Sequence, residues 1–340
     1  MSKKIRQSNI ELLRIVSMFM ILLLHANVFT FGWPEGGLAT NLFRFSAESF
    51  AIVAVNVFVL ITGYLGTSFK LSKIANLVFQ MFFTVFSISL LLLAFNLYHF
   101  SSWKEIIHGF YFWNYWFINA YIGLLILSPL ANLAIKYLSQ SQMRVLLISL
   151  YVLFCIIEGD FFISPSGIGV NSGYSVLWFL FMYLVGRYIA KYPPYIEFKK
   201  LVTVYLFSIV GAITLMWLCC DYGYNSPFIV IESIAFFMFF LKMKITTNKL
   251  INFIASSSLM VFLLHCHPIL VNYFRQALVY LNEMYGNGLT FIILLLGFCV
   301  TVYSLAIGYD QIRKFIWSFI EPRAKSLDGF YKNDSSIIML

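Results

Sequence analysis

The chain has 340 residues, of which 61% are hydrophobic and only 11% are charged. A soluble domain carries about 25% charged residues, so this composition excludes a soluble globular protein and indicates an integral membrane protein. The net charge of +9 does not indicate a nucleic-acid partner, because the basic residues are distributed as in a membrane protein. The five cysteines lie in apolar runs and lack the spacing of a disulfide framework or a zinc site.

Ten apolar segments are candidate membrane spans, most of them near the ~20 residues that a crossing needs. We expect an all-α integral membrane protein with about ten transmembrane helices. In chain order the spans are predicted near residues 10–31, 45–65, 74–97, 115–136, 143–158, 174–190, 201–220, 227–242, 250–270 and 289–309. The first span is interpreted as a retained helix rather than a signal peptide, because Glu11 and Arg14 interrupt it and no small-residue cleavage site follows.

The distribution of Lys and Arg predicts the orientation of these spans. If the N-terminus is cytoplasmic, the inner segments and inner span ends hold 19 of the 23 basic residues, the outer loops hold only Arg44, Lys104 and Arg275, and Arg14 is the remaining one. The positive-inside rule therefore predicts that both termini are cytoplasmic. We expect one membrane domain, residues 1–320, and a short cytoplasmic tail, residues 321–340. The outer loop 159–173 is expected to be irregular and the outer loop 271–288 to form an interfacial helix.

Arg14 and His25 lie eleven residues apart in the first span. At ~100° per residue this spacing is about three turns plus ~20°, so both side chains share one helix face. Their separation along the axis is about 16 Å, roughly half the bilayer core, with Arg14 at the inner end. Ionisable groups inside a membrane helix are candidates for function. Alternatively, Arg14 snorkels to the inner surface beside Glu11, and His25 only bonds a neighbouring helix.

Other polar residues near the outer surface are candidates to support His25. Glu48 opens the second span at a similar depth, and a carboxylate beside an imidazole supports a general base. Alternatively Glu48 faces water, and Glu232 in the eighth span has the same ambiguity. His265 and His267 lie two residues apart, which turns them to different helix faces. We therefore predict no metal site.

Basic residues at the inner ends of spans indicate either topology alone or an anion-binding rim facing the cytoplasm. Lys70 and Lys73 lie between the second and third spans, and Arg187 and Lys191 end the sixth.

Five segments, in order, resemble the acyltransferase 3 family of membrane acyltransferases. Arg14 and His25 match its Arg-x10-His signature, and Val55–Leu65 is close to its Phe-Val-Leu-Ser-Gly-Tyr segment, with Thr62 in place of Ser. The other matching segments are 115–132, 177–188 and 258–265. Many members carry an Arg-x-x-Arg pair where this chain has Lys70 and Lys73. Lysine keeps the charge of that pair but lacks the bidentate fork of arginine.

This resemblance implies an O-acetyltransferase in a bacterial cytoplasmic membrane. The implied donor is cytoplasmic acetyl-CoA, and the implied acceptor is a hydroxyl of a cell-surface glycan or its lipid-linked precursor. We assign catalysis to His25 and Glu48, binding of the CoA phosphates to Arg14, Lys70, Lys73 and Arg187, and acceptor binding to Trp116, Tyr121, Trp178 and His265. Expected partners are the glycan acceptor and membrane lipid but no nucleic acid, and a homo-oligomer is left open.

Two roles for His25 remain open, since it can act as a general base or as a nucleophile that carries the acetyl group outward. The main alternative function is a transporter or flippase of a lipid-linked glycan, with His25, Glu48 and Arg14 as a proton relay. That function requires a proton-motive force and no acetyl-CoA. A receptor or structural membrane protein would leave the shared face of Arg14 and His25 unexplained.

Overall fold

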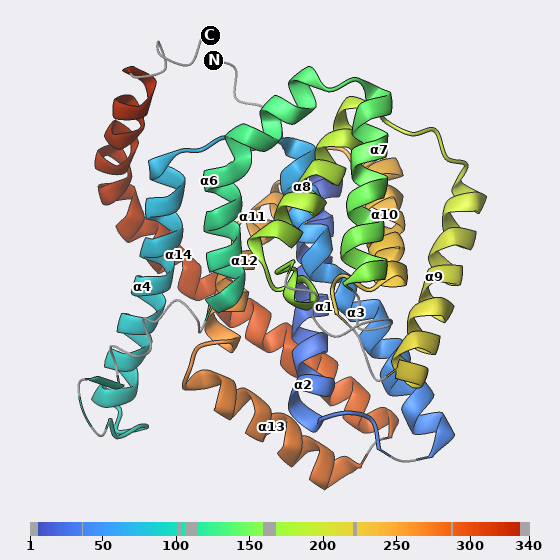
Figure 1. Ribbon diagram of the computed structural model, residues 1–340. Helices are drawn as coiled ribbons and strands as arrows, with labels where there is room; N and C mark the ends of the chain where they lie inside the picture. Colours follow the sequence, from blue (N-terminus) through green and yellow to red (C-terminus); the bar gives the residue numbers. More distant parts are fainter. Residues whose placement is uncertain are drawn as a thin grey trace.

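A computed structural model describes residues 6–35, 37–100, 102, 104–105, 115–158, 168–219, 223–286 and 288–333. The regular secondary structure of these residues is entirely helical, which confirms the all-α prediction (Figure 1). The helices are α1 Ser8–Ala26, α2 Val28–Phe31, α3 Leu38–Leu65, α4 Leu71–Ala94, α6 Trp116–Tyr137, α7 Gln140–Tyr151, α8 Val176–Lys191, α9 Phe198–Cys219, α10 Pro227–Lys242, α11 Lys249–Ala255, α12 Ser258–His265, α13 Leu270–Tyr285 and α14 Leu289–Asn333. Val152–Ile157 continues α7 as a π-helical turn, and Asn171–Gly173 forms a 3-10 turn.

Within the described residues, seven helices are long and apolar enough to cross a membrane, or eight if one bent pair is a single span. The predicted number of about ten spans is therefore not confirmed. Helices α8 and α10 occupy the predicted sixth and eighth spans, but each has only 16 residues. A crossing helix of ~20 residues is longer than either of them.

The predicted ninth span is broken. Helix α11 ends at Ala255 and α12 begins at Ser258, and the Lys314 ammonium of α14 donates to the hydroxyls of Ser256 (2.7 Å) and Ser257 (2.8 Å) at this break.

After α12 the chain turns by 86° into α13. The predicted helix in the loop 271–288 is thus confirmed, and it lies across the lower end of the bundle in Figure 1. A helix perpendicular to a span has the orientation of an interfacial helix.

The two ends of the described chain lie on the same side of the bundle. The start of α1 and the end of α14 are both at the upper end of Figure 1, opposite α2 and α13. Helix α14 continues past the predicted domain boundary at residue 320, so the division into domain and tail stays a prediction. Of the predicted irregular loop 159–173, residues 159–167 lie outside the described residues.

Helix α3 forms the centre of the bundle, where it packs against α1, α8 and α10. In the most apolar 18-residue stretch of α3, 72% of the residues are buried, compared with 17% in the corresponding stretch of the peripheral α14. Two glycines allow α3 and α8 to approach closely. A Cβ on Gly63 would lie 2.3 Å from the Tyr183 carbonyl oxygen, and a Cβ on Gly186 would lie 2.5 Å from that of Leu60. Small residues at such contacts are typical of packed membrane helices.

Replacing Gly186 with Val should separate α3 from α8 and lower the stability of the folded protein. We expect a loss of about 1–3 kcal/mol, because the added atoms meet backbone that cannot move aside. Thermal unfolding in detergent, followed by loss of the monodisperse species, measures the effect. Gly297→Val is the matched control, since a Cβ at Gly297 meets no atom within 4 Å. Equal midpoints for the two variants would contradict the close contact.

Candidate functional site

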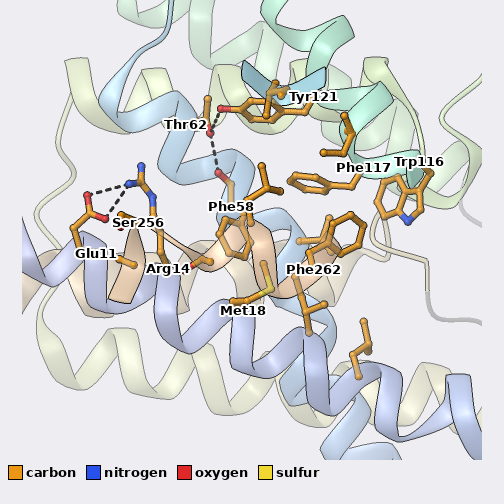
Figure 2. A pocket seen from close by; sticks show the side chains of 18 of the residues that line it. Glu11, Arg14, Met18, Phe58, Thr62, Trp116, Phe117, Tyr121, Ser256 and Phe262 are labelled. Atoms are coloured by element: carbon orange, nitrogen blue, oxygen red, sulfur yellow. Dashed lines mark hydrogen bonds and ion pairs between the residues drawn. The ribbon is translucent and has the colours of Figure 1, made fainter. Parts of the chain in front are cut away.

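A cavity of about 330 Å3 runs beside α1. One wall is a stripe of α1 side chains at steps of three or four residues that ends on the adjacent Leu24 and His25, so the stripe follows one side of the helix. Both Arg14 and His25 belong to this wall, as their predicted shared face requires. Facing side chains come from α3, α6 and α12, as Figure 2 shows. The α1 wall consists of Glu11, Arg14, Met18, Ile21, Leu24 and His25.

The character of the cavity changes along its length. Its Arg14 end is polar, and Arg6 and Ser256 also line it there. Its middle is apolar and includes Met18 of α1 and Phe262 of α12, which lie between Arg14 and Trp116 in Figure 2. Its far end is aromatic. A long ligand with a charged end and a slender apolar stem would match the polar end and the apolar middle of this cavity.

Arg14 binds Glu11 through only one of its nitrogens. Its Nη1 donates to both carboxylate oxygens of Glu11, at 3.0 and 3.1 Å. The other N–H groups of Arg14 have no partner among the described residues, and the side chain is 29% exposed. The guanidinium therefore retains donors for a second anion. Because guanidinium groups bind carboxylates and phosphates with paired N–H donors, this arrangement suits a phosphate.

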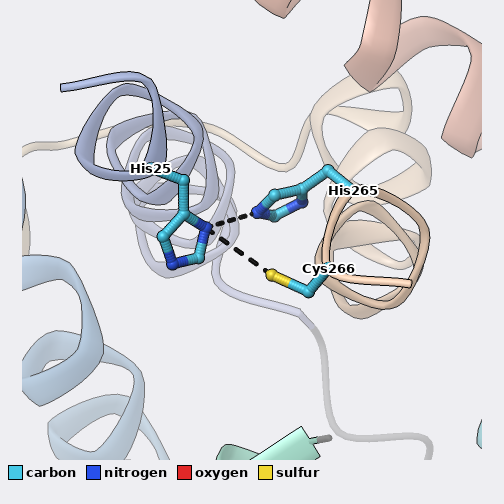
Figure 3. A group of neighbouring side chains, drawn as sticks. All are labelled: His25, His265 and Cys266. Carbon is cyan, nitrogen blue, oxygen red and sulfur yellow. Dashed lines mark hydrogen bonds between the residues drawn. The ribbon is translucent and has the colours of Figure 1, made fainter. Parts of the chain in front are cut away.

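His25 meets α12 at the other end of the cavity. Its Nδ1 lies 2.7 Å from Nε2 of His265 and 3.6 Å from the sulfur of Cys266 (Figure 3). The Nδ1 of His265 lies in turn 2.6 Å from the carbonyl oxygen of Val261. The ligand atoms of His25, His265 and Cys266 all fall within 4.8 Å of one another, which makes them a candidate metal-binding group by composition.

Glu48 does not contact His25 in the described structure. Its Oε2 accepts a hydrogen bond from Asn27 Nδ2 at 2.7 Å, and Asn27 Oδ1 accepts one from Arg44 Nε at 3.0 Å. Arg44 also donates to the carbonyl oxygen of Gly32 at 2.6 Å. This partly buried network fixes the α1–α2 turn against the start of α3. The partner of the imidazole is therefore His265 and not the predicted carboxylate, because the Glu48 side chain is turned toward Asn27.

The predicted basic rim contributes no side chain to the described wall of the cavity, although Leu77, one turn after Lys73 in α4, does line it. The described cavity lining does not include Lys70, Lys73 or Arg187. Lys73 donates to the Thr67 hydroxyl at 2.7 Å. A carboxylate already occupies the start of α4, since Asp328 of α14 accepts from the backbone N–H (3.0 Å) and the hydroxyl (2.6 Å) of Ser72, which directly precedes Lys73. Among the residues predicted to bind the donor, only Arg14 is placed in the cavity wall.

The four residues predicted to bind the acceptor have three different environments. Trp116 and Tyr121 line the cavity. Trp178 is fully buried, and its indole N–H donates to Asn56 Oδ1 at 2.8 Å, so it is a core residue of the bundle. His265 is buried against His25 and is not part of the described lining.

Aromatic rings surround the far end of the cavity. Trp116 stacks on Tyr224 with centroids 5.7 Å apart, and Tyr174 contacts both rings. Tyr174 is 45% exposed, whereas Tyr224 is buried. Such rings offer apolar faces and polar edges together.

Three residues of the cavity wall have no local sequence signal of their own. Arg6 precedes α1, and in the sequence it is only one of the basic residues that predict a cytoplasmic N-terminus. Ser256 lies inside an apolar run that predicts one continuous span. Tyr224 lies within the short outer loop between the predicted spans 201–220 and 227–242. The Ser-Ser-Ser run at 256–258 is the one pattern that could have indicated the break between α11 and α12.

Comparison with known proteins agrees with the resemblance of the five segments. A family model described as an acyltransferase domain matches residues 7–309, which is most of the chain and includes every residue of the α1 wall. Neither the curated proteins nor the solved structures yielded a match.

Proposed function

This chain belongs to the acyltransferase 3 family, and on that premise we propose that it transfers an acetyl group from cytoplasmic acetyl-CoA to a hydroxyl of a surface glycan or its lipid-linked precursor. Membership of this family identifies the chain as a transferase of acyl groups, and the apolar helices of the chain identify it as a multi-pass membrane protein. The acetyl donor, the glycan acceptor and a bacterial cytoplasmic membrane are our proposals. The observation that carries them is the cavity that joins Arg14 to His25.

We propose that the donor enters at the Arg14 end of this cavity. Acetyl-CoA carries its phosphates at one end and its thioester at the tip of a thin pantetheine arm. Arg6 and Arg14 supply cationic donors at the polar end, and apolar side chains line the way to His25. The helical rise from Arg14 to His25 is about 16 Å, a distance for an extended arm rather than a compact ligand.

His25 is the proposed catalytic residue. As a general base it would take the proton of the acceptor hydroxyl while the oxygen attacks the thioester carbonyl, and the C–S bond would break. The departing sulfur would then take that proton. As a nucleophile, the imidazole would instead attack the thioester carbonyl, the C–S bond would break and CoA would leave as a thiolate. The acceptor oxygen would then take the acetyl group from the imidazole, and its proton would pass to the thiolate. Trapping of an acetyl group on His25 separates the two routes.

The acceptor would approach from the aromatic end of the cavity. Trp116 and Tyr224 line this end, and Tyr174 beside them is partly exposed. Aromatic faces stack on the apolar faces of sugar rings, while the tyrosine hydroxyl can bond the sugar's own hydroxyls. This side of the bundle is also the side of α13, opposite the ends of the chain (Figure 1). The donor and the acceptor would thus reach His25 from opposite faces of the membrane.

His25→Ala should abolish acetylation of the surface glycan. We expect a loss of at least about 100-fold, because a general base or nucleophile contributes that much or more. Mass spectrometry of glycans from cells with the wild-type gene, without the gene and with each variant measures the acetyl mass. The matched control is His99→Ala, since His99 is exposed. Acetylation by a correctly inserted His25→Ala would refute both roles of His25. Loss of the whole polymer on deleting the gene would favour the flippase.

Arg14→Gln should raise the KM for acetyl-CoA by about tenfold or more and leave kcat nearly unchanged. One charge-assisted hydrogen bond contributes about 1.5–3 kcal/mol, and its loss from donor binding alone appears in KM. Steady-state kinetics of the purified protein in lipid measures both constants. Arg323→Gln is the control, because Arg323 is exposed near the end of α14. A larger rise in KM for Lys73→Gln than for Arg14→Gln would place the donor at the other basic rim.

The proposed orientation places the end of α14 in the cytoplasm and α13 outside, as the positive-inside rule predicts. In a cysteine-free protein, a single cysteine at Tyr280 of α13 should react with a membrane-impermeant maleimide added to intact cells. A single cysteine at Ser326 of α14 should react only after permeabilisation. Both positions are exposed, so neither result depends on unfolding. The reverse labelling pattern would invert the orientation.

A further inference from the structure

The histidine pair at the end of the cavity has a defined direction. Nδ1 of His265 lies 2.6 Å from the carbonyl oxygen of Val261. A carbonyl oxygen can only accept a hydrogen bond, so this nitrogen carries the proton. A neutral imidazole has one N–H, and therefore Nε2 of His265 has a lone pair. The backbone of α12 thus sets the tautomer of His265.

The same reasoning extends to His25. Its Nδ1 lies 2.7 Å from the lone pair of His265 Nε2, so Nδ1 of His25 must donate. Neutral His25 then has its own lone pair on Nε2. That nitrogen points away from His265 and Cys266 in Figure 3 and has no partner among the described residues. Because His25 belongs to the cavity wall, this lone pair is available to a ligand there.

We propose that His265 is a positioning residue, which fixes His25 in the tautomer whose Nε2 lone pair serves the cavity. This inference rests on the proposed function of His25 and deepens it. When Nε2 takes the proton of the acceptor hydroxyl, the N–H at Nδ1 stays in place and still donates to His265. The imidazolium therefore keeps its orientation until the proton passes to the departing sulfur. On the nucleophilic route, the same lone pair forms the bond to the acyl carbon.

The alternative occupant of this cluster is a metal ion held by His25, His265 and Cys266. Zinc binds imidazole nitrogens at about 2.0–2.1 Å with tetrahedral angles, which separates two such nitrogens by about 3.3 Å. The 2.7 Å between the two imidazoles is shorter and is a hydrogen-bond distance. A metal would also need lone pairs on both facing nitrogens. The geometry therefore assigns a proton, and not an ion, to the space between the rings.

The tautomers can be measured directly, without any activity assay. The chain has only five histidines, so the intact protein labelled with 15N-histidine in lipid gives a simple nitrogen spectrum, assigned by single substitutions. At neutral pH we expect both His25 and His265 to carry the proton on Nδ1 and to have an unprotonated Nε2. A proton on Nε2 of His25, or nitrogen shifts that a chelator changes, would overturn the proposal.

Paired substitutions then test the positioning role. His265→Ala should lower kcat by about 100-fold with KM nearly unchanged, because the base loses its tautomer and orientation. His265→Gln should recover activity to within about tenfold of wild type, since the amide oxygen can accept the Nδ1 proton of His25. The matched controls are the same two substitutions at His267, which donates nothing to His25 and accepts from the backbone N–H of Ile269.

Each result bears on one claim. Equal losses for His265→Ala and His265→Gln, with both variants folded, would show a purely structural role and overturn the proposal. Loss of activity with Cys266→Ala or with a chelator would favour the metal. Full activity of His25→Ala would instead refute the proposed function, while the nitrogen spectrum would still report the tautomer.

Discussion

A helix in the apolar interior of a membrane protein has no water to satisfy its polar side chains, so each must find a partner within the protein. Helix α1 carries two such groups on one face. Arg14 is partly neutralised by Glu11 one turn before it, and His25 is held by His265 of α12. The second bond ties the first helix of the chain to one near its end. The cavity lies between these two supports, so its position depends on both.

Helical geometry makes part of this site predictable from sequence. The shared face of Arg14 and His25 follows from their spacing alone, because that relation is local. The partner of His25 is not local, since His265 is 240 residues away and reaches it only through the packing of α12 against α1. The similar membrane depths expected for Glu48 and His25 suggest a contact that the structure does not contain. Similar depth does not fix the direction in which a side chain points.

The helical fold was predictable because apolar runs of sufficient length appear directly in the sequence. The number of spans was not, since α8 and α10 fill the runs predicted for them but have only 16 residues each, fewer than the ~20 that a crossing needs. The position of Lys70 and Lys73, where the family carries an Arg-x-x-Arg pair, predicts that these lysines bind the CoA phosphates. Only the folded chain shows that Asp328, 256 residues from Ser72, already occupies the start of that helix. A rim of like charges in a sequence does not reveal which carboxylate will pack against it.

The central claim is that acetyl-CoA binds in the cavity lined by α1, so that its phosphates lie at Arg14 and its acyl group reaches His25. A cryo-EM structure of the protein in lipid with a non-hydrolysable acetyl-CoA analogue tests it most directly. The account predicts density in the cavity, with the phosphates beside Arg6 and Arg14 and the acyl end beside Nε2 of His25. Density with its phosphates at Lys73 and Arg187, outside the α1 cavity, would contradict it.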